Sequence, residues 1–301
     1  MDEILAWGLE VVRSVQTAAS PGLTASFRFL SLLGTEYFFL FALPVVYWCV
    51  DHRKGIRLGL LVLVSAVLNS WLKVVFRQPR PYDLDPSVGM ARETSYGLPS
   101  GHSQSSATFW GVVAPWIRAP WGLVLALALP FLIGLSRVYL GVHFPTDVFL
   151  GWALGALFAA SHAVWGDTLE ALVGRLPGRL WIAAAAAAAL GMNALNPEET
   201  GLPGALFGMV VGAVLAASRA RFDAASGGLA RKALRLAAGT AGAAVLYFGL
   251  KAVLPGEGSA NYALFRFLRY GVLGAWVSLG APWVFLRLGL AEERPAATPR
   301  T

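Results

Sequence analysis

Long apolar runs, separated by short polar or basic segments, organise this chain. A bilayer crossing needs roughly 20 apolar residues, and runs of about that length occur at residues 32–50, 58–76, 100–117, 121–139 and 145–165. Four more occur at residues 180–195, 202–218, 234–254 and 268–288. Near the start, apolar positions on one helical face and charges on another predict a short interfacial helix at residues 4–15. The pattern predicts an all-α, polytopic transmembrane bundle.

Composition agrees with this pattern. Of the 301 residues, 56% are hydrophobic and 14% are charged, whereas a soluble domain carries about 25% charged residues. The net charge of +7 does not indicate a nucleic-acid partner, because Lys and Arg lie mainly in short loops beside the apolar runs. Cys49 is the single cysteine, which excludes an internal disulfide and a cysteine-based metal site. We therefore expect the lipid bilayer, and no nucleic acid, as a partner.

The basic residues also predict an orientation. With nine spans, more than half of the 24 Lys and Arg residues fall on one side, in segments such as 53–57 and 219–235. Cytoplasmic loops are enriched in Lys and Arg. We therefore predict an inner (plasma) membrane protein in which the opposite side, described next, faces the periplasm or the exterior.

Three stretches on that predicted outer side carry ionisable groups, which are costly beside apolar runs unless they have partners or a function. The first is Lys73-x6-Arg80-Pro81, at the end of the second span. Lys acts as a point charge, and Arg donates two parallel hydrogen bonds to phosphate oxygens. Two interfacial side chains that snorkel to the membrane surface are the alternative interpretation.

The second stretch, Pro99-Ser100-Gly101-His102, opens the third span. Ser100 suits an N-cap, and Gly101 lets the backbone approach a ligand closely. The free N–H groups of a helix N-terminus bind anions, and His102 lies where it can act as a general acid. The alternative is a capping turn with an interfacial histidine.

The third stretch, residues 136–147, joins the fourth and fifth spans. Pro145 suits the first turn of a helix, which leaves His143 just before it and Asp147 within it. Asp147 can bind one imidazole nitrogen and leave the other free to attack phosphorus, and Arg137 would reach the same phosphate. A structural His–Asp hydrogen bond is the alternative.

Together these stretches resemble the three signature motifs of the type 2 phosphatidic acid phosphatase family, also called lipid phosphate phosphatases. That family is similar in its core to vanadium haloperoxidases and bacterial acid phosphatases. The resemblance covers about residues 30–165. It implies a membrane enzyme that hydrolyses a lipid phosphomonoester or diphosphate in two steps, with no metal or other cofactor.

The resemblance also implies roles for the residues. His143 forms a phosphohistidine and is held by Asp147, while His102 protonates the leaving group. The groups that bind phosphoryl oxygens are Lys73, Arg80, Ser100, Gly101 and Arg137. Undecaprenyl diphosphate is the leading candidate substrate, followed by phosphatidate and phosphatidylglycerophosphate. Phosphotransfer to an acceptor hydroxyl, lipid binding or transport without hydrolysis, and vanadate-dependent halide oxidation stay open as alternatives.

These predictions divide the chain into four parts. They are an interfacial segment (1–30), a lipid phosphatase catalytic core (31–166), C-terminal membrane helices of unassigned role (167–290) and a disordered tail (291–301). The C-terminal helices are rich in Gly and Ala, including an alanine run at 183–189. Small residues let membrane helices approach closely, so we expect helix packing or a homo-oligomer there. The sequence assigns no role to Glu36 or Glu93.

Overall fold

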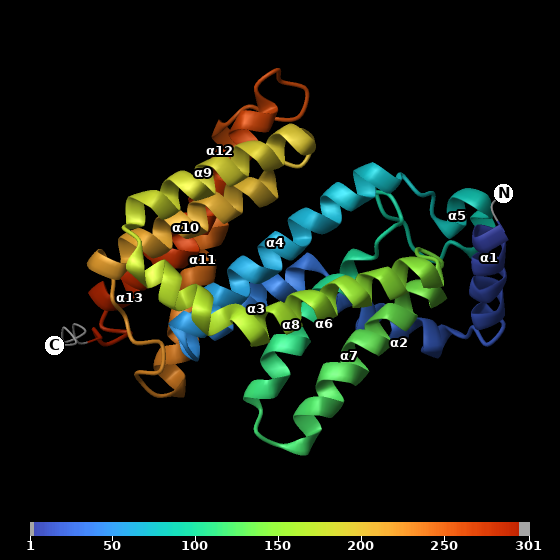
Figure 1. The fold of residues 1–301 in the computed structure, drawn as a ribbon, viewed down its shortest axis with the longest axis horizontal. Helices are drawn as coiled ribbons and strands as arrows, with labels where there is room; N and C mark the ends of the chain where they lie inside the picture. Colours follow the sequence, from blue (N-terminus) through green and yellow to red (C-terminus); the bar gives the residue numbers. More distant parts are fainter. Residues whose placement is uncertain (1–2, 295–301) are drawn as a thin grey trace. The chain divides into compact units, whose positions relative to one another are not determined.

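The computed structural model describes residues 3–294. Within them, all the secondary-structure elements are helices (Figure 1). The α-helices are α1 (Glu3–Gln16), α2 (Pro21–Leu32), α3 (Glu36–Cys49), α4 (His52–Phe76), α5 (Pro81–Leu84), α6 (Gly101–Val113), α7 (Pro120–Tyr139), α8 (Pro145–Arg175), α9 (Gly178–Leu195), α10 (Gly201–Arg219), α11 (Leu229–Val253), α12 (Tyr262–Ala275) and α13 (Ala281–Arg287). The all-α prediction is confirmed. Of the predicted disordered tail, residues 295–301 lie outside the described residues.

Six helical segments of the described chain are long and apolar enough to cross a membrane. The bent pair of α2 and α3 makes a seventh if it is one span. Two of the nine predicted spans do not qualify. Helix α6 has 13 residues and gives way to a 3₁₀ turn that contains Pro115, and a π-helical turn at Trp276–Gly280 interrupts the last apolar run. The protein is a multi-pass membrane protein with fewer uninterrupted spans than the hydrophobic pattern predicts.

Two predicted boundaries are wrong for local reasons. Residues 51–57 read as a charged turn, but α4 begins at His52, because an Asp51 carboxylate oxygen accepts the backbone N–H groups of Arg53 at 2.8 Å and Lys54 at 3.1 Å. Helix α8 continues past the predicted end at 165, because no proline interrupts it before Pro177. The predicted basic loop after α8 is correspondingly reduced.

Helix α2 is not predicted by the apolar runs. Its start has a local cause, because the Ser20 hydroxyl accepts the N–H of Leu23 at 3.3 Å and Pro21 occupies the first turn. The chain then breaks at residues 33–35, and α3 continues at an angle of 48° to α2. The predicted first span, residues 32–50, thus corresponds to α3, which forms a bent pair with α2.

The described chain forms two compact units, which are considered separately. The first unit comprises the residues up to Leu40 together with Val64–Leu169, and it holds all three polar stretches. Its core includes a hydrophobic cluster of Leu9, Val12, Val88, Val138, Phe144 and Val148. This cluster packs α1 against the connection between α7 and α8, which carries His143.

The second unit comprises Phe41–Leu63 and the described residues from Glu170 onward. Small residues serve close packing of its helices, since a Cβ atom at Gly204 or Gly208 of α10 would collide with the backbone of Phe267 or Gly271 of α12. The fully buried Arg235 donates to the carbonyl oxygens of Trp48 at 2.7 Å and Ala224 at 3.0 Å, and also to that of Ser226. Helix packing within the chain thus accounts for part of the Gly-rich pattern, and a homo-oligomer stays a prediction.

Candidate active site

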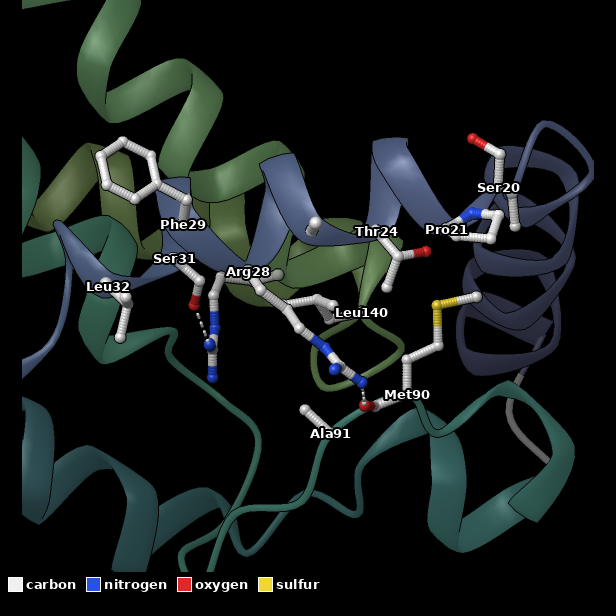
Figure 2. A pocket seen from close by; sticks show the side chains of 13 residues that line it. Ser20, Pro21, Thr24, Arg28, Phe29, Ser31, Leu32, Met90, Ala91 and Leu140 are labelled. Carbon is white, nitrogen blue, oxygen red and sulfur yellow. Dashed lines mark hydrogen bonds between the residues drawn. The ribbon is translucent and has the colours of Figure 1, made fainter.

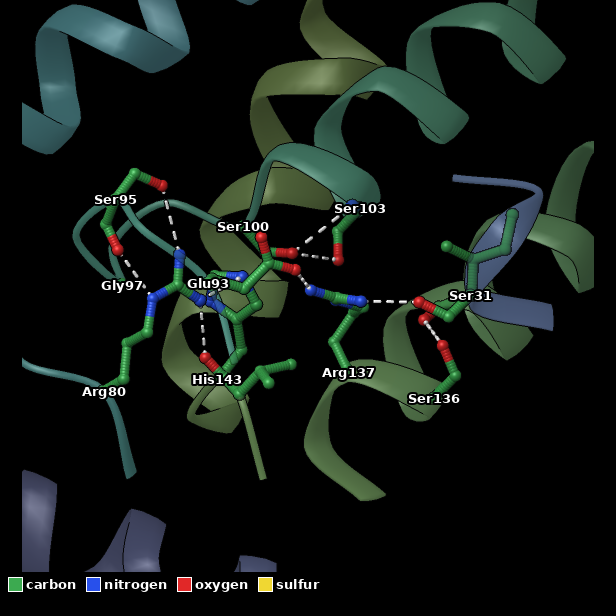
Figure 3. A network of polar contacts seen from close by, with 12 residues as sticks. Ser31, Arg80, Glu93, Ser95, Gly97, Ser100, Ser103, Ser136, Arg137 and His143 are labelled. Carbon is green, nitrogen blue, oxygen red and sulfur yellow. Dashed lines mark hydrogen bonds and ion pairs between the residues drawn. The ribbon is translucent and has the colours of Figure 1, made fainter. Parts of the chain in front are cut away.

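The three polar stretches meet within the first unit (Figure 3). Each of their charged residues lies at or just beyond the end of a helix. Lys73 is in the last turn of α4, Arg80 precedes α5, Arg137 is in the last turn of α7, and His143 and Asp147 flank the start of α8. Helix ends carry unpaired backbone N–H and C=O groups, so charged side chains can gather there without interrupting the apolar spans.

His143 and Asp147 are both buried, with exposures of 2% and 0%. His143 Nδ1 lies 3.1 Å from Asp147 Oδ2, which also accepts the backbone N–H of Phe144 at 3.0 Å. The second carboxylate oxygen accepts a hydrogen bond from Gln78 Nε2 at 2.5 Å. Asp147 is therefore fixed by three donors, and it fixes the imidazole ring in turn.

Gly141 shapes the turn that presents His143. Its φ of +68° lies in the left-handed region, and a Cβ atom would meet the Val88 carbonyl group. After this reversal, the N–H groups of Val142 and His143 both donate to the Arg137 carbonyl oxygen, at 3.2 and 3.3 Å. The fully buried Phe144 then anchors the chain in the hydrophobic cluster described above.

Contacts of the ring define its tautomer. Arg80 Nη1 lies 3.2 Å from His143 Nε2, and a guanidinium group only donates hydrogen bonds. Nε2 is therefore the unprotonated acceptor, and Nδ1 carries the hydrogen that Asp147 accepts. Burial, and then the positive charges of Arg80, Lys73 and Arg137, lower the pKa of His143 well below its ordinary 6.5. The ring is neutral at neutral pH, with a lone pair on Nε2.

Arg80 and Lys73 are held by the loop at residues 95–97. Arg80 is 3% exposed and donates to the Ser95 carbonyl oxygen at 2.7 Å and the Tyr96 carbonyl oxygen at 3.0 Å. Lys73 Nζ donates to the same Tyr96 carbonyl oxygen at 2.5 Å. Because one peptide group receives both cations, their positions are coupled.

Arg137 is 3% exposed and pairs with Glu93, and its Nη1 donates to the Ser31 hydroxyl at 2.5 Å (Figure 3). Its Nε is buried and has no hydrogen-bond partner among the described residues. Glu93, to which the sequence assigns no role, thus forms an ion pair with a candidate site residue. Glu36, by contrast, is exposed in the first turn of α3.

The second stretch is tied to the third through the backbone. Ser100 N–H donates to the Asp147 carbonyl oxygen at 2.9 Å. The Ser100 hydroxyl oxygen caps α6 by accepting the backbone N–H of Ser103 at 3.4 Å, and it also accepts from the Ser103 hydroxyl at 2.9 Å. Gly101 opens α6, and a Cβ atom there would lie 3.3 Å from Asn69 Oδ1. His102 is partly exposed, and within residues 3–294 its ring makes no hydrogen bond. Ser100, two residues earlier, is bonded to Asp147, so His102 lies at the helix start that adjoins the turn of His143.

A cavity of about 1040 Å³ adjoins Arg137 (Figure 2). Its wall consists mainly of residues of α2, together with Met90, Ala91 and Leu140. Arg137 belongs both to this wall and to the cluster around His143. No group of three or more His, Cys, Asp or Glu side chains in the described part of the chain could hold a metal ion.

A neutral, carboxylate-bound imidazole beside two arginines and a lysine can bind a phosphoryl group and attack it. In a multi-pass helical bundle, such a site is typical of a membrane enzyme that acts on phosphate esters. Comparison with known proteins specifies the family. The pattern of the PAP2 superfamily matches residues 54–170, and that of the PAP2 superfamily phosphatase transmembrane extension matches residues 200–293.

The chain belongs to the PAP2 superfamily, and it is a membrane phosphatase. This confirms the resemblance that the motifs carry. Residues 200–293, which hold α10 to α13 and for which the sequence alone indicates no family, match the transmembrane extension of phosphatases in this superfamily.

Two curated relatives and one solved structure show how far the similarity extends. An undecaprenyl-diphosphatase of Sulfolobus acidocaldarius is 30% identical over 52% of this chain and 76% of its own length. Phosphatidylglycerophosphatase B of Bacillus subtilis is 39% identical over 33% of this chain and 53% of its own length. The crystal structure of a transmembrane phosphatidylglycerophosphate phosphatase from Bacillus subtilis matches with a TM-score of 0.50, at 24% identity, over 56% of this chain and 88% of that chain. At this identity the structure supports the fold alone.

Proposed function

We propose that this protein is an integral-membrane lipid phosphatase that works through a phosphohistidine at His143. The observation that carries the proposal is the arrangement of that ring, with Asp147 Oδ2 3.1 Å from Nδ1 and Arg80 Nη1 3.2 Å from Nε2. It provides a nucleophile in the reactive tautomer and a phosphate-binding cation at the atom that would attack.

In the first step, the terminal phosphoryl group of the substrate binds to Lys73, Arg80 and Arg137. A phosphoryl oxygen replaces His143 Nε2 as the acceptor of the Arg80 hydrogen bond, which frees the Nε2 lone pair. The bond between Nε2 and phosphorus forms while the bond from phosphorus to the leaving oxygen breaks, and His102 donates its proton to that oxygen. Asp147 stabilises the positive charge that the ring acquires.

In the second step, a water molecule attacks the phosphohistidine. His102 accepts a proton from this water, the bond between phosphorus and Nε2 breaks, and the neutral His143 ring is restored. Inorganic phosphate leaves the cation cluster, which completes the hydrolysis without a change in any other residue.

A lipid is the substrate class that the setting and the relatives support. The site lies at the ends of apolar helices, and relatives carry names that specify a prenyl diphosphate and a glycerophospholipid phosphate. Undecaprenyl diphosphate is our leading substrate. The distribution of basic residues supports a site on the periplasmic or exterior face of the inner (plasma) membrane.

Phosphate release by the detergent-purified protein tests this function. The panel consists of prenyl diphosphates, phosphatidate and phosphatidylglycerophosphate, assayed with a chelator and without added metal. Loss of a catalytic nucleophile costs on the order of 10³-fold or more, so His143→Ala should abolish release. His162→Gln, a histidine elsewhere on α8, is the matched control and should retain release. Turnover retained by His143→Ala would exclude the mechanism.

A further inference from the structure

The cavity beside Arg137 carries an excess of positive charge. Its two charged side chains are Arg28 of α2 and Arg137, and no Asp or Glu lines it. Glu93 pairs with Arg137 from outside the cavity wall, but Arg28 forms no ion pair within residues 3–294. Figure 2 shows the Arg28 guanidinium beside Met90, to whose carbonyl oxygen Nη2 donates at 3.3 Å. A positive concave surface with apolar walls favours an anionic ligand that also has an apolar part.

A second observation connects this cavity with the reactive histidine. Arg137 is 3% exposed and its Nε is buried without a hydrogen-bond partner in the described structure. A buried donor of this kind is costly unless a ligand or water accepts from it. Arg137 is shared by the cavity wall and the cluster around His143, and Ser31, which accepts from Arg137 Nη1 at 2.5 Å, also lines the cavity. A ligand that reaches from His143 to Arg28 would therefore pass Arg137.

The chemistry of the leaving group indicates what would occupy that position. When His143 attacks a lipid diphosphate, the bond between the terminal phosphorus and the bridging oxygen breaks. The electron pair stays on that oxygen, negative charge develops there as the bond breaks, and His102 then protonates it, so the leaving group is a lipid monophosphate. A guanidinium beside it would bind the ground state and stabilise the departing anion. A lipid monophosphate substrate has no group to place there.

We propose that Arg28 binds the second phosphate of a lipid diphosphate, so that the α2 cavity selects diphosphates over monophosphates. The proposal rests on the proposed lipid phosphatase function. Helix α2 lies outside the segment at 54–170 that matches the superfamily.

Binding of two uncleavable probes tests the selection directly. Farnesyl methylenediphosphonate carries both charged groups, and farnesyl phosphonate carries one. The Kd of each is measured for the wild-type protein, Arg28→Gln, Arg28→Lys and the control Arg118→Gln, an exposed arginine at the other end of α7. Loss of one charge-assisted contact should weaken diphosphonate binding by about tenfold more than monophosphonate binding in Arg28→Gln.

Arg28→Lys should recover part of this difference, and Arg118→Gln should not change the ratio of the two Kd values. If Arg28→Gln weakens both probes by the same factor, or neither, Arg28 does not select diphosphates. Turnover separates this result from a failure of the proposed function. If the wild-type protein hydrolyses lipid phosphates, His143→Ala does not, and the two probes show no Arg28-dependent preference, the inference about Arg28 is overturned and the phosphatase function stands. If diphosphonate binding depends on Arg28 but the wild-type protein hydrolyses no lipid phosphate, the lipid phosphatase function alone is overturned.

Discussion

Replacing Asp147 by Asn is the sharpest test of how the imidazole is prepared for attack. The carboxylate accepts hydrogen bonds from His143 Nδ1, Phe144 N–H and Gln78 Nε2. An amide has one acceptor and one donor end. If its NH₂ group faces Nδ1, the hydrogen moves to Nε2 and the attacking lone pair is lost. If its oxygen faces Nδ1, the tautomer is kept but the negative charge is gone.

The size of the effect follows from the geometry. Attack places a positive charge on a ring whose Nδ1 lies 3.1 Å from Oδ2. At an effective dielectric constant of about 20, a charge pair at that separation is worth about 5 kcal/mol. This corresponds to about 10⁴-fold in rate. We expect kcat for Asp147→Asn to fall by roughly 10³- to 10⁴-fold while KM changes little, because the charge is needed mainly in the transition state.

The assay measures initial rates of phosphate release from a lipid diphosphate over a range of substrate concentrations, so that kcat and KM separate. The thermal unfolding temperature of the same preparation checks that the variant is folded. A folded Asp147→Asn protein whose kcat lies within about tenfold of the wild type would refute the reasoning, since about 1.4 kcal/mol is far less than the charge interaction predicts.

Three further predictions concern stability and pH. Gly141→Ala should lower the free energy of unfolding by about 1–3 kcal/mol, because φ is +68° and the Val88 carbonyl group blocks a Cβ atom. Thermal denaturation measures this, and Gly174→Ala, whose Cβ atom would meet no atom within 4 Å, is the matched control. Arg235→Ala should cost roughly 3–5 kcal/mol, because it leaves buried carbonyl groups unpaired, and a denaturant titration measures this; an unfolding midpoint equal to the wild type would contradict it. Native His143 stays neutral well below pH 6.5 while the unfolded residue gains a proton there, so its contribution to stability is lost as the pH falls below 6.5. The fall in unfolding temperature between neutral and acidic pH should accordingly be smaller in His143→Gln than in the wild type.

The positions of the candidate site residues at helix ends could be predicted from the sequence because they lie where apolar runs end. A span ending near Phe76, another starting near Ser100 and a third starting at Pro145 fix Lys73, His102 and His143 at helix ends. Alternation of the predicted spans then predicts that these ends lie on one face, although α6 is too short to count as an uninterrupted span. This reasoning needs only the length of a span and the position of a proline, both of which are local properties.

Positioning residues could not be found in this way, because loop conformation decides their contacts. Nothing in the sequence around Glu93 shows that it meets Arg137, 44 positions later. Gln78 lies between two motif residues, yet its contact with Asp147 depends on how the chain leaves α4. Carbonyl groups such as that of Tyr96, which receives both Lys73 and Arg80, have no sequence signature at all.

Interruptions within apolar runs are the other feature that the sequence does not predict. The bend between α2 and α3 and the π-helical turn at Trp276–Gly280 occur inside segments that hydropathy alone reads as continuous. Hydropathy does not report such breaks, because an apolar segment can contain a bend or a π-helical turn and keep its mean hydropathy. The number of uninterrupted spans, and the orientation predicted from it, is for that reason harder to predict from the sequence than the three polar motifs.

Trapping the covalent intermediate tests the central claim most directly. The wild-type protein is mixed with a lipid substrate labelled with ³²P in its terminal phosphate, quenched in alkali within milliseconds and digested for peptide mapping. We predict a transient, acid-labile phosphate on the peptide that contains His143, absent from His143→Ala. Turnover without any label on His143, or a label on another residue, would contradict the phosphohistidine mechanism.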